Sequence, residues 1–239
     1  MDTALIIGVG AYAGIGAAVA RRFAEEGLHV ALAGRTLERL EERASEIRNA
    51  GGSASVHPTD VRKEDQISEL FDAAESQGPL RSVVFNPGAN VRHSLAETEA
   101  WLFEHIWRVA TFGGFLVARE AARRMHTSGG SVLFTGATGS LRGAAGHAAF
   151  AAAKGGLRMV AQSMAREYGP QGLHVAHIIV DGAVDGERVR AGFPGRLDNV
   201  GKDEALAPDS IADSFWHLHA QAPSAWTFEL DLRPFKETF

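Results

Sequence analysis

The sequence predicts an α/β protein with one doubly wound parallel sheet of about seven strands and helices on both faces. Short apolar runs rich in β-branched residues alternate with segments of helical periodicity, which is typical of a parallel sheet buried on both faces. With 239 residues, 45% hydrophobic and 22% charged, the chain can build one continuous core. No linker, repeat or low-complexity segment interrupts the pattern, so we expect a single domain over residues 1–239.

Seven apolar runs are the expected strands. They cover residues 4–9, 29–33, 54–57, 82–85, 131–135, 174–180 and 226–232. The segments between them carry apolar residues at helical spacing, as Leu40, Ala44 and Ile47 illustrate. Gly27 and Gly78 follow two of these segments, at positions where glycine commonly ends a helix.

One irregular segment, about residues 181–208, contains five glycines and no clear periodicity. We expect it to form a substrate lid over the carboxyl edge of the sheet, because long irregular loops in compact domains commonly shape ligand sites. It contains no motif from which a substrate could be named.

The composition excludes several classes of protein. The formal net charge is −5 and there is no block of Lys and Arg, whereas nucleic acids and anionic membranes require a basic surface. The chain has no cysteine, which rules out disulfides, thiolate metal sites and a cysteine nucleophile. The longest uncharged run, residues 5–20, is short for a membrane span and lacks a basic signal-peptide region before it. We expect a cytoplasmic protein that acts on a small molecule, with no nucleic-acid or membrane partner.

A glycine-rich loop, residues 8–16, joins the first expected strand to the first helix. Glycines let such a loop turn sharply and approach a phosphate, and the free N–H groups of the following helix attract an anion. We interpret the loop as a site for the pyrophosphate of a dinucleotide; a tight turn without a ligand is the alternative. The residues expected to contact the cofactor here are Gly10, Tyr12, Ala13, Gly14, Ile15 and Gly16.

Arg35 follows the second strand, where an NAD-binding protein usually offers a carboxylate to the ribose. That carboxylate is absent, and Arg35 immediately precedes Thr36, the expected N-cap of the second helix. A cation at the positive end of a helix dipole is unfavourable unless an anion accompanies it. The 2′-phosphate of NADP(H) fits this requirement, so we expect NADP(H) to be favoured over NAD(H). A solvated surface arginine is the alternative.

These motifs together resemble those of the short-chain dehydrogenase/reductase family, over nearly the whole chain. The matching segments are Gly10-xxx-Gly14-Ile15-Gly16, Asp60-Val61, Asn86-Pro87-Gly88-Ala89 and Lys154. The resemblance implies a Rossmann-like fold, with Asp60 and Val61 at the adenine and Asn86, Gly88 and Lys154 among the other cofactor-binding residues. Taken singly, Asp60 could cap a helix, Asn86 could brace a turn, and Lys154 could be a solvated helix residue.

The family's reactive residues are replaced in this chain. Its tyrosine, four residues before the lysine, is Phe150; its serine, about thirteen residues earlier, is Ala137; and its asparagine in the preceding long helix is Ala110. In the family the tyrosine gives a proton to the carbonyl as hydride arrives, and losing a positioned acid typically costs about 10²- to 10⁴-fold in rate. The chain therefore keeps the residues that bind a cofactor and lacks those that react.

Neighbouring polar residues are candidates for the missing roles. The predicted catalytic residues are Lys154, Ser140 and His147. His147 lies three residues before Phe150, and histidine suits proton transfer near neutral pH. Thr138 and Ser140 could hold a substrate oxygen, with backbone capping as the alternative. Asp181 stands where the family commonly has proline, which places a carboxylate near the expected nicotinamide or, alternatively, in a turn.

The sequence also suggests self-association. Residues 144–168 are rich in small residues, which permit close helix packing. In the resembled family this helix and the preceding long one build a dimer, and the last strand builds a second interface. The last expected strand, residues 226–232, alternates apolar and polar residues, as a strand with one buried face should. We expect a homodimer or a homotetramer.

Two functions of different classes remain open. The first is an NADP(H)-dependent oxidoreductase that acts on an unidentified small carbonyl or alcohol with a non-standard proton donor. The second is a catalytically degenerate NADP(H)-binding sensor or partner subunit, suggested by Ala110, Ala137 and Phe150. Non-redox chemistry in the same pocket is a third, minor possibility.

Overall fold

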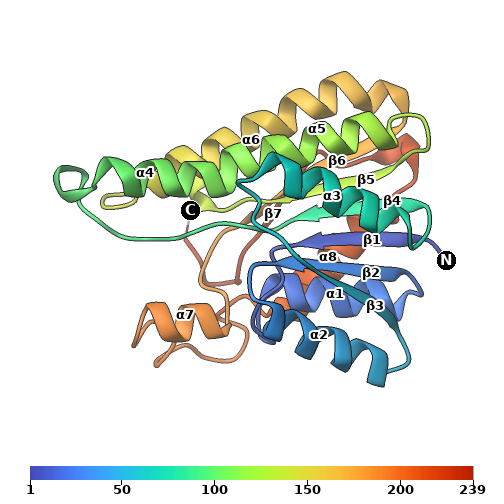
Figure 1. The fold of residues 1–239 in the computed structure, drawn as a ribbon. Coiled ribbons are helices and arrows are strands. Elements are labelled where there is room, and N and C mark those ends of the chain that lie inside the picture. The colour runs from blue at the N-terminus through green and yellow to red at the C-terminus, as the bar shows by residue number, and fades with distance from the viewer. Residues whose placement is uncertain (239) are drawn as a thin grey trace.

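The computed structural model describes residues 1–238, and it contains the predicted seven-stranded parallel sheet (Figure 1). The strands are β1 (Thr3–Ile7), β2 (His29–Gly34), β3 (Ser53–Pro58), β4 (Leu80–Phe85), β5 (Gly130–Thr135), β6 (Leu173–Val180) and β7 (Glu229–Leu232). Their order across the sheet is β3-β2-β1-β4-β5-β6-β7, and every neighbouring pair is parallel. The winding direction reverses between β1 and β4, which is where ligands bind in open α/β sheets. The predicted fold class is confirmed.

Helices cover both faces of the sheet, as Figure 1 shows. One face carries α1 (Ile15–Glu25), α2 (Leu37–Asn49) and α8 (Pro208–His219), and the other carries α3 (Glu64–Glu75), α4 (Ala100–Trp107), α5 (Gly113–Met125) and α6 (Ala148–Tyr168). A π-helical turn, η2 (Arg108–Phe112), joins α4 to α5. Because side chains alternate along a strand, Ala4 and Ile6 of β1 enter the first core while Leu5 and Ile7 enter the second. This two-sided burial explains the continuous apolar runs of the strands.

Short one-turn elements complete the chain. They are η1 (Leu95–Glu97), η3 (Thr138–Ser140), η4 (Gly169–Gln171) and η5 (Pro223–Ala225). The turn η3 lies between the carboxyl end of β5 and the start of α6, so it stands at the edge of the sheet where the strands end.

The last strand begins three residues later than the sequence pattern predicts. The backbone N–H of Thr227 donates to Gln221 Oε1 (2.8 Å), and the Trp226 indole donates to the Gln221 carbonyl (3.2 Å), so both residues are held to the end of α8. Phe228 packs into the core beneath α6 while Leu230 packs into the opposite core. The predicted alternation with one buried face is therefore wrong before residue 229.

The segment expected to be an irregular lid contains a short helix, α7 (Glu187–Gly192), which stands beyond the carboxyl edge of the sheet in Figure 1. An isolated parallel bridge pairs Val184 with Leu206 near the two ends of the segment. Gly186 passes close to the glycine loop, because a Cβ added there would lie 2.3 Å from the Ala13 carbonyl oxygen. Within residues 1–238, no helix is both long and apolar enough to cross a membrane.

Candidate functional site

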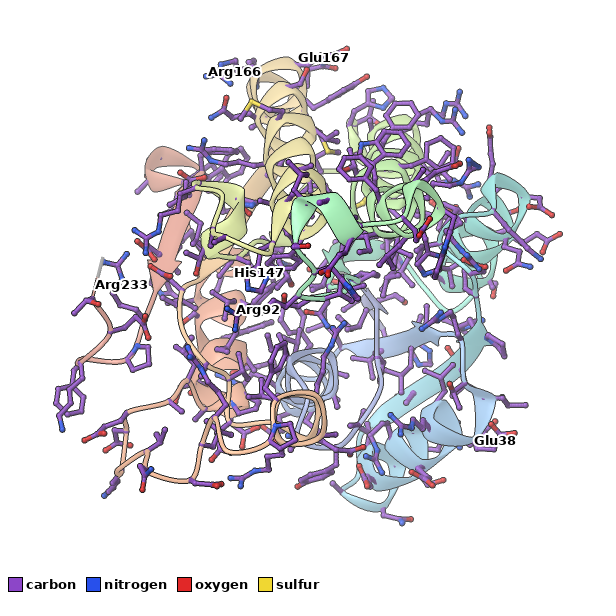
Figure 2. All side chains as sticks on the ribbon, turned by 90° about the vertical axis from the view of Figure 1, so that its left-hand side faces the viewer. Glu38, Arg92, His147, Arg166, Glu167 and Arg233 are labelled. Carbon is purple, nitrogen blue, oxygen red and sulfur yellow. The ribbon has the colours of Figure 1, made fainter. Side chains whose placement is uncertain are left out.

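A cavity of about 840 Å³ opens at the carboxyl edge of the sheet, the side that faces the viewer in Figure 2. Loops after the first six strands contribute to its wall, together with α6 and α7. Most of the predicted cofactor residues line it: Gly10, Ala13, Gly14, Ile15, Gly16, Arg35, Asp60, Val61, Asn86, Gly88 and Lys154. The fold thus brings residues spaced over about 145 positions of the chain to one site, as parallel strands that end at a common edge require.

The glycine loop is held tightly against the ends of β2 and β4. The N–H groups of Gly8 and Val9 both donate to the Ala33 carbonyl (2.8 and 3.0 Å), and the Asn86 side-chain amide donates to the Gly8 carbonyl (3.1 Å). A Cβ added at Gly16 would lie 2.5 Å from the Gly8 carbonyl oxygen, so only glycine lets α1 start this close to β1.

The N-terminus of α1 is open to an anion. Gly14 is the N-cap in an extended conformation, so it offers no side-chain oxygen to the first N–H groups of the helix. The first turn carries no acidic residue. The unpaired N–H groups and the helix dipole therefore favour a negatively charged ligand at the cavity wall.

Three arginines surround the part of the cavity next to β2. They are Arg35, Arg39 and Arg188. Arg188, whose side chain is exposed at the rim of the cavity, donates to the Gly88 carbonyl (2.6 Å), and desolvation by the cavity wall, together with the charge of Arg35, lowers its pKa. Arg39 lies 3.5 Å from Glu187, an exposed pair, whereas Arg35 forms no ion pair with any residue that the structure describes. Positive charge is thus in excess on this wall.

Asp60 is held as a carboxylate by its neighbour Arg62, whose guanidinium lies 2.5 Å from Asp60 Oδ2. These hydrogen bonds lower the pKa of Asp60 to about 2. Arg62 also contacts His105 Nδ1 (3.1 Å). Val61 is buried beside Gly113, where an added Cβ would lie 3.0 Å from a Val61 methyl group. Both residues lie at the wall where the resemblance expects the adenine.

Lys154 lies at the base of the cavity with only 4% of its surface exposed. Its Nζ donates to the Thr135 carbonyl (2.7 Å) and to the Pro87 carbonyl (3.4 Å). An ammonium group has three N–H donors, so one remains for a ligand. Burial, with a smaller contribution from the charge of Arg188, lowers the pKa of Lys154 to about 7.

The positions where the resembled family carries its reactive serine and tyrosine are apolar. Ala137 and Phe150 both line the cavity. The Phe150 ring packs on η3, since a Cβ added at Gly139 would lie 3.0 Å from Phe150 Cδ1. Ala110, in η2, is buried in a small apolar cluster with Ala149 and Ala153. None of the three side chains can donate or accept a proton.

Three predicted site residues do not line the cavity. Tyr12 is exposed, with the Arg21 guanidinium 4.3 Å from its ring centroid. Ser140 is buried, and its Oγ accepts the N–H of Ala137 (3.1 Å). His147 immediately precedes α6; its Nδ1 is buried, with no hydrogen-bond partner in the part of the chain that the structure describes. Figure 2 shows it near Arg92, which packs on Gly146.

Thr138 and Asp181 form a contact that the sequence spacing does not reveal. Thr138 lines the cavity, and its Oγ1 donates to Asp181 Oδ1. Asp181 is buried at the end of β6 and lies 3.5 Å from Arg233. Arg188 is the other residue that sequence reasoning missed, because it comes from the lid, which carries no recognisable motif.

Comparison with known proteins identifies relatives over the full fold. A family model described as short chain dehydrogenase matches residues 3–191. The crystal structure of a short-chain dehydrogenase from Rhodopseudomonas palustris is 41% identical, covers 98% of this chain and 99% of that one, and has a TM-score of 0.85. A metagenomic short-chain oxidoreductase in complex with NADP is 25% identical, covers 99% of this chain and 98% of that one, and has a TM-score of 0.83.

Curated relatives match over shorter stretches. The uncharacterized oxidoreductase YuxG of Bacillus subtilis is 38% identical over 119 residues, which are 48% of this chain and 17% of that protein. A short-chain type dehydrogenase/reductase of Picea abies is 37% identical over 126 residues, 48% of this chain and 46% of that protein. The matches thus span less than half the length of these two relatives.

Proposed function

Because this chain belongs to the short-chain dehydrogenase family, we propose that it is an NADP(H)-dependent oxidoreductase that acts on a small carbonyl or alcohol with a non-standard proton donor. The observation that carries the proposal is a single cavity in which the glycine loop, Asn86 and Lys154 lie together with the apolar Ala137 and Phe150. Every predicted cofactor residue except Tyr12 lines this cavity, whereas the two positions facing it carry no proton donor.

The residues present fit a pyridine dinucleotide. The α1 N-terminus offers unpaired N–H groups for a pyrophosphate. Lys154 keeps an N–H donor for the nicotinamide ribose, a role that the family resemblance suggests. The nicotinamide, when bound, supplies or accepts a hydride. Lys154 would orient it, and the apolar Phe150 and Val109 would exclude water from the reacting carbon.

NADP(H) is favoured over NAD(H) by charge. Arg35 and Arg188 line the cavity next to β2, and the position after β2 where a carboxylate would repel a 2′-phosphate holds Arg35; Glu187, an acidic residue on the same wall, pairs with Arg39. Desolvation and, second to it, the charge of Arg35 lower the pKa of Arg188, and a phosphate there would relieve the repulsion between the two arginines. The related metagenomic oxidoreductase was crystallised with NADP, which supports the same choice.

Among the proposed catalytic residues, Lys154 has the direct role because it lines the cavity. With its pKa lowered to about 7, its Nζ can hold or release a proton near neutral pH. Ser140 and His147 would act by holding their segments: Ser140 closes the turn η3, and His147 occupies the start of α6.

The alternative, an NADP(H)-binding sensor or partner subunit, is favoured by one observation: Ala110, Ala137 and Phe150 remove three polar groups at once. The two functions predict the same binding and different turnover. A sensor would bind NADPH without oxidising it in the presence of any substrate.

The test combines a fluorescence titration of NADPH with assays of NADPH oxidation by aldehydes, ketones and imines and of NADP⁺ reduction by alcohols. We expect saturable binding of one NADPH per chain and turnover of at least one compound. Binding without turnover, together with no activity in the double variant Phe150→Tyr, Ala137→Ser, would favour the sensor. Absence of binding to any pyridine nucleotide would refute both functions.

A further inference from the structure

We propose that Thr138 and Asp181 form a proton-accepting pair that takes the hydroxyl proton of an alcohol substrate, so that the site is built for alcohol oxidation. The inference rests on the proposed function and assigns the proton acceptor that Ala137 and Phe150 cannot provide. It starts from a hydroxyl group that lines the cavity and bonds to a buried carboxylate.

The direction of the hydrogen bond decides which ligand Thr138 can accept. Its Oγ1 donates to Asp181 Oδ1. A hydroxyl group has one hydrogen and two acceptor lone pairs, so Thr138 can then only accept from a molecule in the cavity. An alcohol O–H meets this requirement, whereas a carbonyl oxygen, which is itself an acceptor, does not.

Asp181 is set up to be the final acceptor. It is 4% exposed, its backbone N–H donates to the Leu232 carbonyl (2.8 Å), and Arg233 lies 3.5 Å from its Oδ2. A buried carboxylate needs a nearby cation and hydrogen-bond donors. Arg233 and Thr138 supply them from the segments that follow β7 and β5, the two strands that flank β6 in the sheet.

The turn η3 keeps Thr138 in place. The Ala137 N–H donates to Ser140 Oγ (3.1 Å), and the Ser140 N–H donates to the Ala137 carbonyl (2.7 Å). Phe150 packs against Gly139 from α6. The hydroxyl is thus presented by a turn that is closed by two hydrogen bonds and supported by an aromatic ring.

The cavity around Thr138 suits an alcohol with an apolar body. Its walls near η3 and the lid include Val109, Phe150, Val184 and Phe193. These side chains offer no hydrogen bond to the body of a substrate, so the hydroxyl group is the part of the ligand that Thr138 would hold.

Oxidation of the alcohol moves one proton and one hydride. The alcohol O–H proton passes to Thr138 Oγ1 while the proton of Thr138 passes to Asp181 Oδ1. The carbinol C–H bond breaks as its hydride reduces the oxidised nicotinamide cofactor, and the C–O bond becomes C=O. Asp181 then carries the proton as a carboxylic acid and gives it to water when the carbonyl product leaves.

The main experiment compares Asp181→Asn with Asp231→Asn. Both variants remove one carboxylate from Arg233, which contacts both residues, but only Asp181 contacts Thr138. With NADP⁺ and the probes cyclohexanol, 1-phenylethanol and 2-octanol, we expect kcat in Asp181→Asn to fall by about 10²-fold or more. The alcohol KM should change little, because the Thr138 hydroxyl remains. The kcat of Asp231→Asn should stay within about twofold of the wild-type value.

Thr138 gives a second, independent comparison. Thr138→Val removes the hydroxyl at nearly constant shape and should lose turnover, whereas Thr138→Ser should regain it. NADPH titration of each variant checks that the fold and the cofactor site are intact. If Asp181→Asn fails to fold, the comparison of Thr138→Val with Thr138→Ser still tests whether the pair accepts the proton of the alcohol.

The proposal is overturned if Asp181→Asn or Thr138→Val oxidises the alcohols at rates near the wild type. It is also overturned if the wild-type protein binds NADP⁺ but oxidises none of the three probes. Failure of the proposed function looks different, because the wild-type protein would then turn over none of the aldehydes, ketones, imines and alcohols assayed above, or would bind no pyridine nucleotide at all.

Discussion

Arg35 is the residue on which the choice of cofactor depends. It lines the cavity beside Arg188 without an ion-pair partner in residues 1–238. We expect Arg35→Ala to weaken NADPH binding by roughly tenfold or more, because a hydrogen bond to a charged group contributes about 1.5–3 kcal/mol. NADH lacks the 2′-phosphate, so its affinity should hardly change. Fluorescence titration of both nucleotides measures the difference.

The matched control for this prediction is Arg166→Ala. Arg166 is exposed on α6 and donates hydrogen bonds to the side chain and the carbonyl of Gln162. It removes the same charge far from the cavity, as its place in Figure 2 shows, and should leave both affinities unchanged. An equal loss of NADPH and NADH affinity in Arg35→Ala would count against the assignment.

His177 makes the fold sensitive to acid. It is fully buried, and burial lowers its pKa to about 4, although its Nδ1 contacts Glu229 Oε2 (3.0 Å). That contact is therefore the hydrogen bond of a neutral imidazole to a carboxylate. Below a pH of about 6.5 the unfolded chain binds a proton that the folded chain does not, so stability falls between about pH 6.5 and 4.

The contribution of His177 to this loss of stability can be measured by comparing how the free energy of unfolding depends on pH in the wild type and in variants. Between pH 7.5 and pH 5, it should account for about 2 kcal/mol of the loss in the free energy of unfolding. Urea unfolding of His177→Asn should show a shallower slope than the wild type over this interval. His217→Asn, on the exposed side of α8, should keep the wild-type slope; identical slopes in all three proteins would contradict the prediction.

The residues of the glycine loop that line the cavity were largely predictable from the sequence, whereas the position of His147 near Phe150 was not. Glycines at a strand–helix junction have a fixed geometric role, so Gly10, Gly14 and Gly16 line the cavity as expected. His147 lies three residues before Phe150, but it precedes the first turn of α6 with φ −122° and ψ 24°. The rule that residues three apart share a helix face does not apply there.

At the scale of elements, different glycines in the junction between β1 and α1 should affect stability and cofactor binding. Gly16→Ala should destabilise the protein by about 1–3 kcal/mol, because its Cβ would lie 2.5 Å from the Gly8 carbonyl oxygen. Gly10→Ala should fold normally, since nothing lies within 4 Å of its Cβ, yet it should weaken NADPH binding where the loop approaches phosphate. Thermal melting and NADPH titration of the two variants test this split; equal stability of both would refute it.

The strands were easier to predict than the segments at the edge of the sheet. Each central strand is buried on both faces, so its sequence is a continuous apolar run, as in β1 and β6. β7 has a neighbour on one side only, so hydrogen bonds from Gln221 can hold the preceding residues out of the strand. In the lid, α7 has no buried residue, and without an apolar face its sequence shows no helical period.

At the scale of the whole molecule, an aromatic row on the outer face of α4 and α5 supports the expectation of a homodimer or a homotetramer. Trp107 stacks on Phe112 (6.1 Å between ring centroids), which in turn lies 6.4 Å from Phe115. Trp107 and Phe115 are 38% and 43% exposed. Exposed aromatic surface of this kind is typical of protein interfaces.

We expect Phe115→Asp to weaken self-association, because a carboxylate buried in such an interface loses its hydration. Light scattering at micromolar concentration should give a multiple of the 25.5 kDa chain mass for the wild type and a lower mass for the variant. Leu37→Asp places the same charge on an exposed residue of α2 and serves as the control. A monomeric wild type would end the proposal of a homo-oligomer.

The reversal of winding between β1 and β4 also bears on how the molecule resists unfolding. Within each half of the sheet, paired strands are closer in sequence, but the two halves meet where residues of β1 pair with residues of β4 nearly eighty positions later. Because closing so long a loop costs more conformational entropy, we expect this pairing to form late in folding. The cavity straddles that seam, with Gly8 on one side and Asn86 on the other. A nucleotide bound there would contact both halves of the sheet and so stabilise the folded state. We expect the protein with bound NADPH to have a higher Tm than the protein without it.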